Sequence, residues 1–125
     1  PAGTALAVGR ALAEGRRVVA VGTTVVRALE SAARGTGHVR AGHGVATTRL
    51  SAAAPPRIVT AILSGTHEPG TSHYALLEGF VDAALLAQAT AQMCALGYRT
   101  HEFGDSVLVE RSGVASARAL QRLAA

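Results

Sequence analysis

The amino-acid sequence predicts an α/β fold, in which a partly parallel sheet carries helices on its faces. Two apolar runs rich in β-branched residues, RVVAV at 17–21 and RIVTAIL at 57–63, have the composition of buried strands. A stretch with helical spacing of apolar residues follows the first run, as expected where strands and helices alternate. The chain has 125 residues, 49% of them hydrophobic, which is enough for the core of one domain. We therefore expect residues 1–125 to form a single α/β domain.

The first half of the chain places a strand between two helices. Residues 5–14 have a helical pattern that ends at Gly15. The run at 17–21 is uniformly apolar, which favours the middle of a parallel sheet over a half-exposed position. From 25 to 35, apolar residues recur at three- and four-residue spacing and predict the second helix. A glycine-rich loop follows, and VATTRL at 45–50 is a weaker strand candidate.

The second half begins with the strand at 57–63 and a loop at 64–72. Residues 73–96 have a helical pattern that we expect to break near Gly79 and to end at Gly97. Two short strands, YRTHEF at 98–103 and SVLVE at 106–110, are then expected on either side of a Gly-Asp turn. The last dozen residues are expected to form a helix or a frayed terminus.

The net charge is +4, and all twelve basic residues are arginine. Without lysine the chain offers neither a Schiff-base nor a P-loop lysine. Arginines spread along the sequence are compatible with binding a phosphate backbone but do not demonstrate it. No apolar run approaches the ~20 residues that span a bilayer, and no leader with basic flanks opens the chain. We therefore expect a cytoplasmic protein without membrane contact, in which the single Cys94 is a buried small hydrophobe.

Polar residues follow the first predicted strand, where α/β sheets bind their ligands. Gly22, Thr23 and Thr24 lead into the second helix, and a helix start favours an anion or a polar group. The ordinary alternative is that a threonine caps the helix. Arg27 is expected to reach a substrate carboxylate or phosphate or, in the ordinary alternative, to pair with Glu30 on the helix surface.

The loop after the second strand reads THEPGTSHY at 66–74 and begins like a zinc-peptidase signature. In that signature two histidines four residues apart face one metal from a helix. Here His67 and His73 are six apart, and Pro69-Gly70 favours a turn, so we expect no metal.

The same loop is better suited to substrate binding. We expect Thr71 or Ser72 to cap the next helix. His67 and Glu68 are expected to transfer protons, unless they are ordinary surface residues. Because parallel strands end at one edge of a sheet, this loop and Thr23-Thr24 should lie on a common rim.

Three motifs in order carry a family resemblance. VVAVGTTVVRALESAA at 18–33 is similar to the Gly-Thr-Thr-x-x-Arg-x-Leu-Glu signature of the S-adenosylmethionine:tRNA ribosyltransferase-isomerases of queuosine biosynthesis. The family's His-x-Pro-x-Ser-Thr loop resembles THEPGTS at 66–72, and its terminal Tyr-Arg-Phe…Tyr-Gly-Asp-Ala element resembles YRTHEFGDS at 98–106. The resemblance covers about residues 5 to 110. The chain departs from the family at Gly65-Thr66, Glu68 and Gly70, where the family has Asn-Phe, an apolar residue and Lys, so it resembles a divergent member.

The resemblance implies that the ribosyl group of S-adenosylmethionine is transferred and isomerised onto a 7-deazaguanine base in tRNA. It also implies an α/β domain plus a separate β-barrel domain, of which this chain would be the C-terminal part of the α/β domain. S-adenosylmethionine and tRNA are then the expected substrate and partner, with no metal cofactor. A non-catalytic module that binds a nucleotide or a protein on the same scaffold, and a metal-dependent hydrolase, are the alternatives.

The implied site has two groups of residues. We expect His67 or Glu68 to transfer the proton. Substrate contacts are expected from residues at the two loops and the Gly-Asp turn: Gly22, Thr23, Thr24, Arg27, Glu30, Thr71, Ser72, His73, Tyr74 and Asp105. For Asp105, which would contact a ribose hydroxyl or a cation, a role in the turn is an equal alternative.

Overall fold

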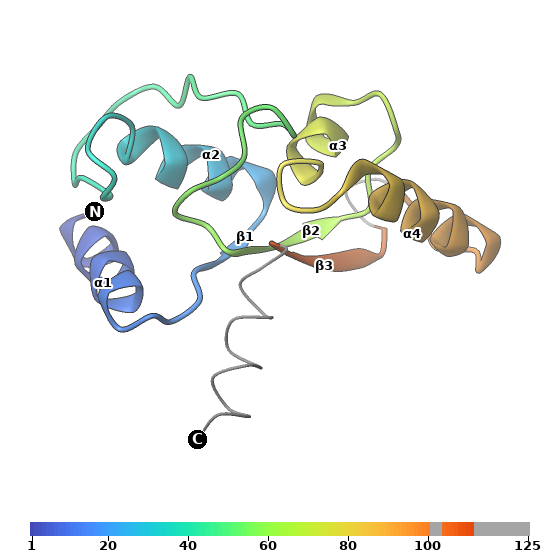
Figure 1. Cartoon of the computed structure of the whole chain (residues 1–125), viewed down its shortest axis with the longest axis horizontal. Coiled ribbons are helices and arrows are strands. Elements are labelled where there is room, and N and C mark those ends of the chain that lie inside the picture. Colours follow the sequence, from blue (N-terminus) through green and yellow to red (C-terminus); the bar gives the residue numbers. More distant parts are fainter. Residues whose placement is uncertain (101–103, 112–125) are drawn as a thin grey trace.

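The computed structural model describes residues 1–100 and 104–111, so the expectations for 101–103 and 112–125 lie outside the described residues. It contains helices α1 (Ala2–Ala13), α2 (Thr23–Ala32), α3 (Ser72–Leu77) and α4 (Ala83–Ala95), and strands β1 (Val19–Val21), β2 (Ala61–Gly65) and β3 (Ser106–Glu110). Figure 1 shows α2 and α3 on one side of the sheet, with α1 beyond β1. The predicted α/β fold is confirmed.

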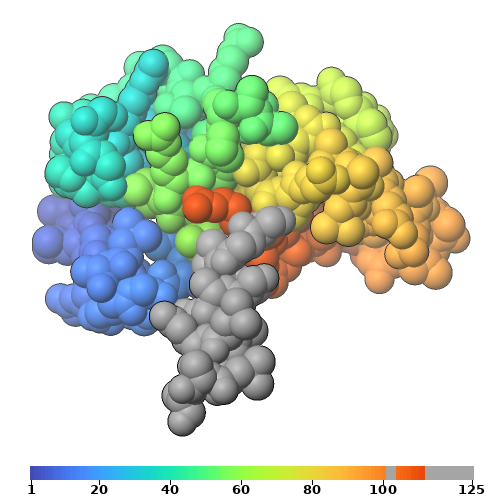
Figure 2. All heavy atoms as spheres, viewed as in Figure 1, coloured from blue at the N-terminus to red at the C-terminus, as the bar shows by residue number. Residues whose placement is uncertain are grey.

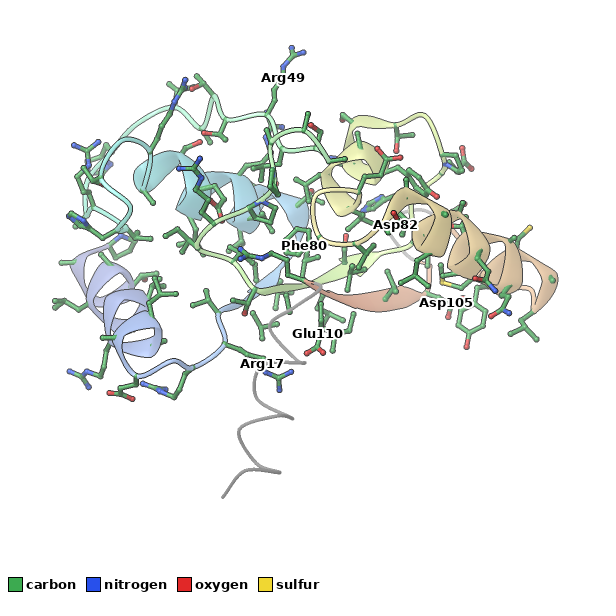
Figure 3. The ribbon with its side chains drawn as sticks, viewed as in Figure 1. Arg17, Arg49, Phe80, Asp82, Asp105 and Glu110 are labelled. Carbon is green, nitrogen blue, oxygen red and sulfur yellow. The ribbon has the colours of Figure 1, made fainter. Side chains whose placement is uncertain are left out.

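The described sheet has the order β1-β2-β3 and is mixed. Strands β1 and β2 are parallel, with Val21 opposite Leu63. Strand β3 runs antiparallel to β2, with Val109 opposite Ile62. The ion pair between Arg17, just before β1, and Glu110 at the end of β3 lies beneath the sheet (Figure 3). The sheet is therefore partly parallel, as the sequence predicts.

The core lies on the helix side of the sheet. Ile62 and Val26 are fully buried there, and Tyr74, Leu77 and Phe80 pack into the same cluster. A smaller cluster joins α1 to the region before β2 and contains Val8, Val18, Ala33 and Ile58. Leu29 of α2 packs against both clusters, so α2 joins them.

The opposite side of the sheet exposes apolar side chains. Val21, Leu63 and Leu108 form one row across the three strands and are 67%, 39% and 55% exposed. Strand β1 is thus an edge strand among the described residues, with Val19 and Val21 exposed, and the expectation of a central buried strand is wrong here. The apolar composition of a strand indicates that both of its faces are buried in the folded protein. It does not indicate which segment packs against each face.

Other element boundaries also differ from the expectations. Residues 45–50 form no strand, and β2 begins at Ala61, because the backbone at 57–59 is bound by a side chain of α2 instead of a neighbouring strand. Residues 98–100 form no strand either. The predicted break near Gly79 is confirmed, since α3 ends at Leu77 and Asp82 caps α4 through the backbone N–H groups of Ala84 and Leu85. Cys94 is exposed on α4, contrary to expectation, because α4 buries only Leu86.

Candidate functional site

Two loops begin at the end of the sheet where β1 and β2 finish. The backbone N–H of Gly22, just after β1, donates to the carbonyl oxygen of Leu63 in β2 at 2.8 Å. Because the two strands are parallel, Thr23-Thr24 and His67-Glu68 both follow strands at this end of the sheet. The two loops therefore begin at the same end of the sheet, as predicted, whereas a common crevice between them stays a prediction.

The start of α2 differs from a side-chain cap. Gly22 is the N-cap residue, with a positive φ of 88° that favours glycine, and no side chain caps the helix. Thr23 and Thr24 are therefore the first two helical residues, and the capping alternative is wrong. Thr23 is buried, whereas Thr24 is exposed and lines a groove beside α2.

His67 has two defined neighbours at this rim. The Oγ atom of Ser64 lies 2.8 Å from Nε2 of His67, and Ser64 is only 6% exposed. The ring centroid of His73, from the start of α3, lies 4.9 Å from that of His67. Burial and, after it, the nearby charge of His73 lower the pKa of His67. A lowered pKa keeps the imidazole neutral at neutral pH, which is the form that can accept a proton.

The rest of the loop is held by its own hydrogen bonds. Thr71 caps α3, since its Oγ1 accepts from the backbone N–H of Tyr74 at 3.2 Å, as predicted. The same hydroxyl donates to the carbonyl oxygen of Glu68 at 2.8 Å. The hydroxyl of Thr100 lies 3.3 Å from Oε1 of Glu68, which places this carboxylate toward the segment that precedes β3. Ser72 is exposed at the first turn of α3.

Tyr74 lies in the core and not on the rim. It is 6% exposed, and its hydroxyl lies 3.4 Å from Oγ1 of Thr90 in α4. The phenol therefore joins α3 to α4. The expected substrate contact through Tyr74 does not fit this position, because the third residue after the cap of α3 packs its side chain into the core cluster.

Glu30 lies at the other end of the sheet. Its carboxylate accepts hydrogen bonds of 2.8 to 3.0 Å from the backbone N–H groups of Arg57, Ile58 and Val59, which precede β2. The side chain is 7% exposed, and Arg27 forms no ion pair with it. Neither the surface pair nor a substrate contact through Glu30 fits this geometry. Glu30 anchors the backbone that leads into β2.

Asp105 closes a turn. Its Oδ2 accepts from the backbone N–H of Arg99 at 2.8 Å, and its own N–H donates to the carbonyl oxygen of Arg99 at 3.0 Å. A Cβ atom on Gly104 would lie 2.2 Å from that same carbonyl oxygen, so the close approach requires glycine. This arrangement favours the turn alternative for Asp105.

Sequence reasoning did not select Ser64 and Thr66. Thr66 is 4% exposed, and its hydroxyl donates to the carbonyl oxygen of Arg99 at 2.7 Å. Its backbone N–H donates to the carbonyl oxygen of Asp105, so it ties the loop at 66–71, called the histidine loop below, to the turn before β3. Their place in the sequence could have identified them, because a buried hydroxyl near the end of a strand needs a hydrogen-bond partner.

The described part of the chain contains no group of three or more His, Cys, Asp or Glu side chains that could hold a metal ion. None of its helices has the length and apolar character needed to cross a bilayer.

The arrangement of strands, α2 and the histidine loop is an α/β fragment that matches part of a solved tRNA ribosyltransferase. It is similar to the crystal structure of S-adenosylmethionine tRNA ribosyltransferase from Thermotoga maritima, with a TM-score of 0.75 and 26% sequence identity. The similarity covers 86% of this chain and 38% of that chain.

Residues 1–109 match the queuosine biosynthesis protein family, and the chain belongs to that family. It is 44% identical over 111 residues to the S-adenosylmethionine:tRNA ribosyltransferase-isomerase of Thermus thermophilus, covering 87% of this chain and 32% of the relative. The corresponding protein of Deinococcus radiodurans is 38% identical over 107 residues, covering 86% of this chain and 29% of the relative. The chain thus spans about a third of the length of the curated relatives that it matches.

Proposed function

We propose that the protein to which this chain belongs is an S-adenosylmethionine:tRNA ribosyltransferase-isomerase of the cytoplasm. The observation that supports this most strongly is the 44% identity to a relative of that name over most of the chain. The substrates are then S-adenosylmethionine and a tRNA that carries a 7-deazaguanine base. No metal is required in this scheme.

The chemistry needs a base near the sulfonium centre. The positive sulfur acidifies the neighbouring C5′ protons of the ribosyl group, so a neutral base within hydrogen-bond reach can remove one. His67 suits this task because burial and His73 lower its pKa and keep it neutral. Oγ of Ser64 lies 2.8 Å from Nε2, and in the tautomer whose Nε2–H donates to this oxygen, Nδ1 is unprotonated and can accept the proton. Glu68 is the second candidate, at the same loop.

The start of α2 is proposed to hold the substrate. Thr24 and the first backbone N–H groups of α2 favour an anionic or polar group, and Arg27 is a half-buried guanidinium on the same helix without an ion-pair partner in the described residues. Thr71, Ser72 and His73 would contact substrate from the facing loop. Glu30, Tyr74 and Asp105 are left out of this group because their polar atoms bind within the protein.

The decisive experiment uses the full-length protein, labelled S-adenosylmethionine and tRNA that carries the unmodified precursor base. We expect release of adenine that depends on both substrates. Binding of S-adenosylmethionine or tRNA without adenine release would favour the non-catalytic module instead. Because the chain spans only about a third of its relatives, we expect residues 1–125 alone to release none, and release by this fragment would contradict that expectation.

A further inference from the structure

A groove beside α2 has a lining that suits an anion. Its volume is about 700 Å³, and it lies between α2, the first turn of α1 and the loop at 39–46. Its polar side chains include Thr24 from α2 and Arg40 and His43 from the loop. No carboxylate lines it.

The net charge of the chain lies in the stretch of sequence that contains α2 and this loop. Residues 23–60 contain five of the twelve arginines but only one of the eight acidic residues, so this stretch carries the whole net charge of +4. That one acid is Glu30, which is buried and bound to backbone N–H groups. The exposed surface of this stretch therefore has cations without neighbouring carboxylates from the same segment.

The loop is hydrogen-bonded to α2 at two points, one on each side of residues 41–46. The backbone N–H of Arg40 donates to the carbonyl oxygen of Ala32 at 3.2 Å, and Thr48 bonds through both its hydroxyl and its N–H to the hydroxyl of Ser31. Both anchors thus lie on the last turn of α2. They bring Arg40 and, one residue after Thr48, Arg49 to the two ends of this stretch. Figure 3 shows Arg49 pointing away from the body of the molecule.

The backbone between these anchors also offers donors. Within the described residues, the N–H groups of 41–46 make no hydrogen bond to the protein. Residues 41–45 are exposed, with Val45 84% exposed, and the stretch lies in the upper part of the surface in Figure 2. Two arginines, an imidazole and free backbone N–H groups are the donors that proteins use for phosphate oxygens.

We propose that the loop at 39–49 and the adjoining groove form a contact surface for the phosphate backbone of tRNA. Arginines and backbone N–H groups would contact phosphates, which orients the nucleic acid without reading its sequence. The proposal extends the proposed function, because it assigns the polyanionic substrate to a surface outside the histidine loop.

The test measures tRNA binding by the full-length protein at several salt concentrations. The variant Arg40→Gln/Arg49→Gln is compared with the control Arg10→Gln/Arg16→Gln, which removes the same charge from α1 and the segment after it. For the first variant we expect affinity to fall about tenfold near 0.1 M salt, and the slope of log K against log salt to become shallower by about two. Equal losses in the two variants, or an unchanged slope in the first, would overturn the proposal.

A second measurement distinguishes the source of the phosphate. Binding of AMP and of inorganic phosphate is measured with the same proteins. If Arg40→Gln/Arg49→Gln loses AMP or phosphate binding but keeps its tRNA affinity, the groove holds a soluble anion and the proposal is wrong. Adenine release by the same variant distinguishes the two proposals. If Arg40→Gln/Arg49→Gln releases adenine at the same rate and with the same dependence on tRNA concentration, the tRNA-contact surface is refuted and the proposed enzyme activity is not.

Discussion

The two ends of the sheet use titratable side chains in opposite ways. At the end where β2 begins, Glu30 is buried and its carboxylate is occupied by three backbone N–H groups. At the end where β2 finishes, His67 is only partly buried, contacts other side chains and has a lowered pKa. A polar group that is fully satisfied by backbone stabilises the fold, whereas one that is held by side chains and kept in its reactive form is suited to chemistry.

The largest effect should come from the Glu30 end. We expect Glu30→Ala to lower the free energy of unfolding by about 3 kcal/mol, because it leaves three backbone N–H groups, two of them buried, without an acceptor. Chemical denaturation of the full-length protein measures this. Arg27→Ala, on the same helix, is the control and should lower stability much less while weakening substrate binding. Loss of activity in Glu30→Ala with unchanged stability would mean that the two ends do not differ as described.

At the other end, His67→Ala should lower kcat by about 100-fold or more while KM and stability change little, as expected for a group that acts in proton transfer. The measurement is adenine release at saturating substrate. An unchanged kcat would make His67 a structural loop residue and move the search to Glu68 or to the remainder of the full-length protein.

A smaller effect is expected for Ser64. Ser64→Ala removes the partner of Nε2, so His67 loses its fixed orientation and kcat should fall about tenfold. Ser64→Thr keeps the hydroxyl and should restore most of the rate. If the two variants have equal rates, the hydroxyl does not position His67.

The smallest effect is a shift in pH dependence. Turnover should fall as the pH drops through the pKa of His67, because the protonated ring cannot accept a proton. The neighbouring charge of His73 lowers that pKa, so His73→Gln should raise it and move the acid limb of the kcat profile to higher pH. A limb that moves to lower pH, or does not move, would show that His73 does not act on His67.

The sequence predicted those features of the two ends of the sheet that follow from the direction of the strands. Parallel β1 and β2 could be inferred from two apolar runs, and their direction brings Gly22 and His67 to one edge. The cap at Thr71 could be inferred from a local pattern, because capping involves only neighbouring residues.

Contacts between distant segments could not be inferred in this way. Glu30 meets Ile58, 28 residues away, and nothing in the spacing of Arg27 and Glu30 distinguishes that partner from a surface ion pair. Tyr74 was expected among the substrate contacts, but its position on α3 turns it into the core. The exposed face of β1 was missed for a similar reason, since composition does not reveal which strand lies at an edge.

The carboxylate of Glu30 also limits what comparing sequences can reveal about the acceptor base. A shorter Asp would not reach the three amides from the same helix position, and Gln would turn an NH2 group toward one of them. We therefore expect Glu at this position in any protein whose backbone approaches β2 along the same path, whatever base that protein modifies. A glutamate shared there by two proteins would report a common chain path, and differences in acceptor choice should be sought at Glu68 and Gly70 instead.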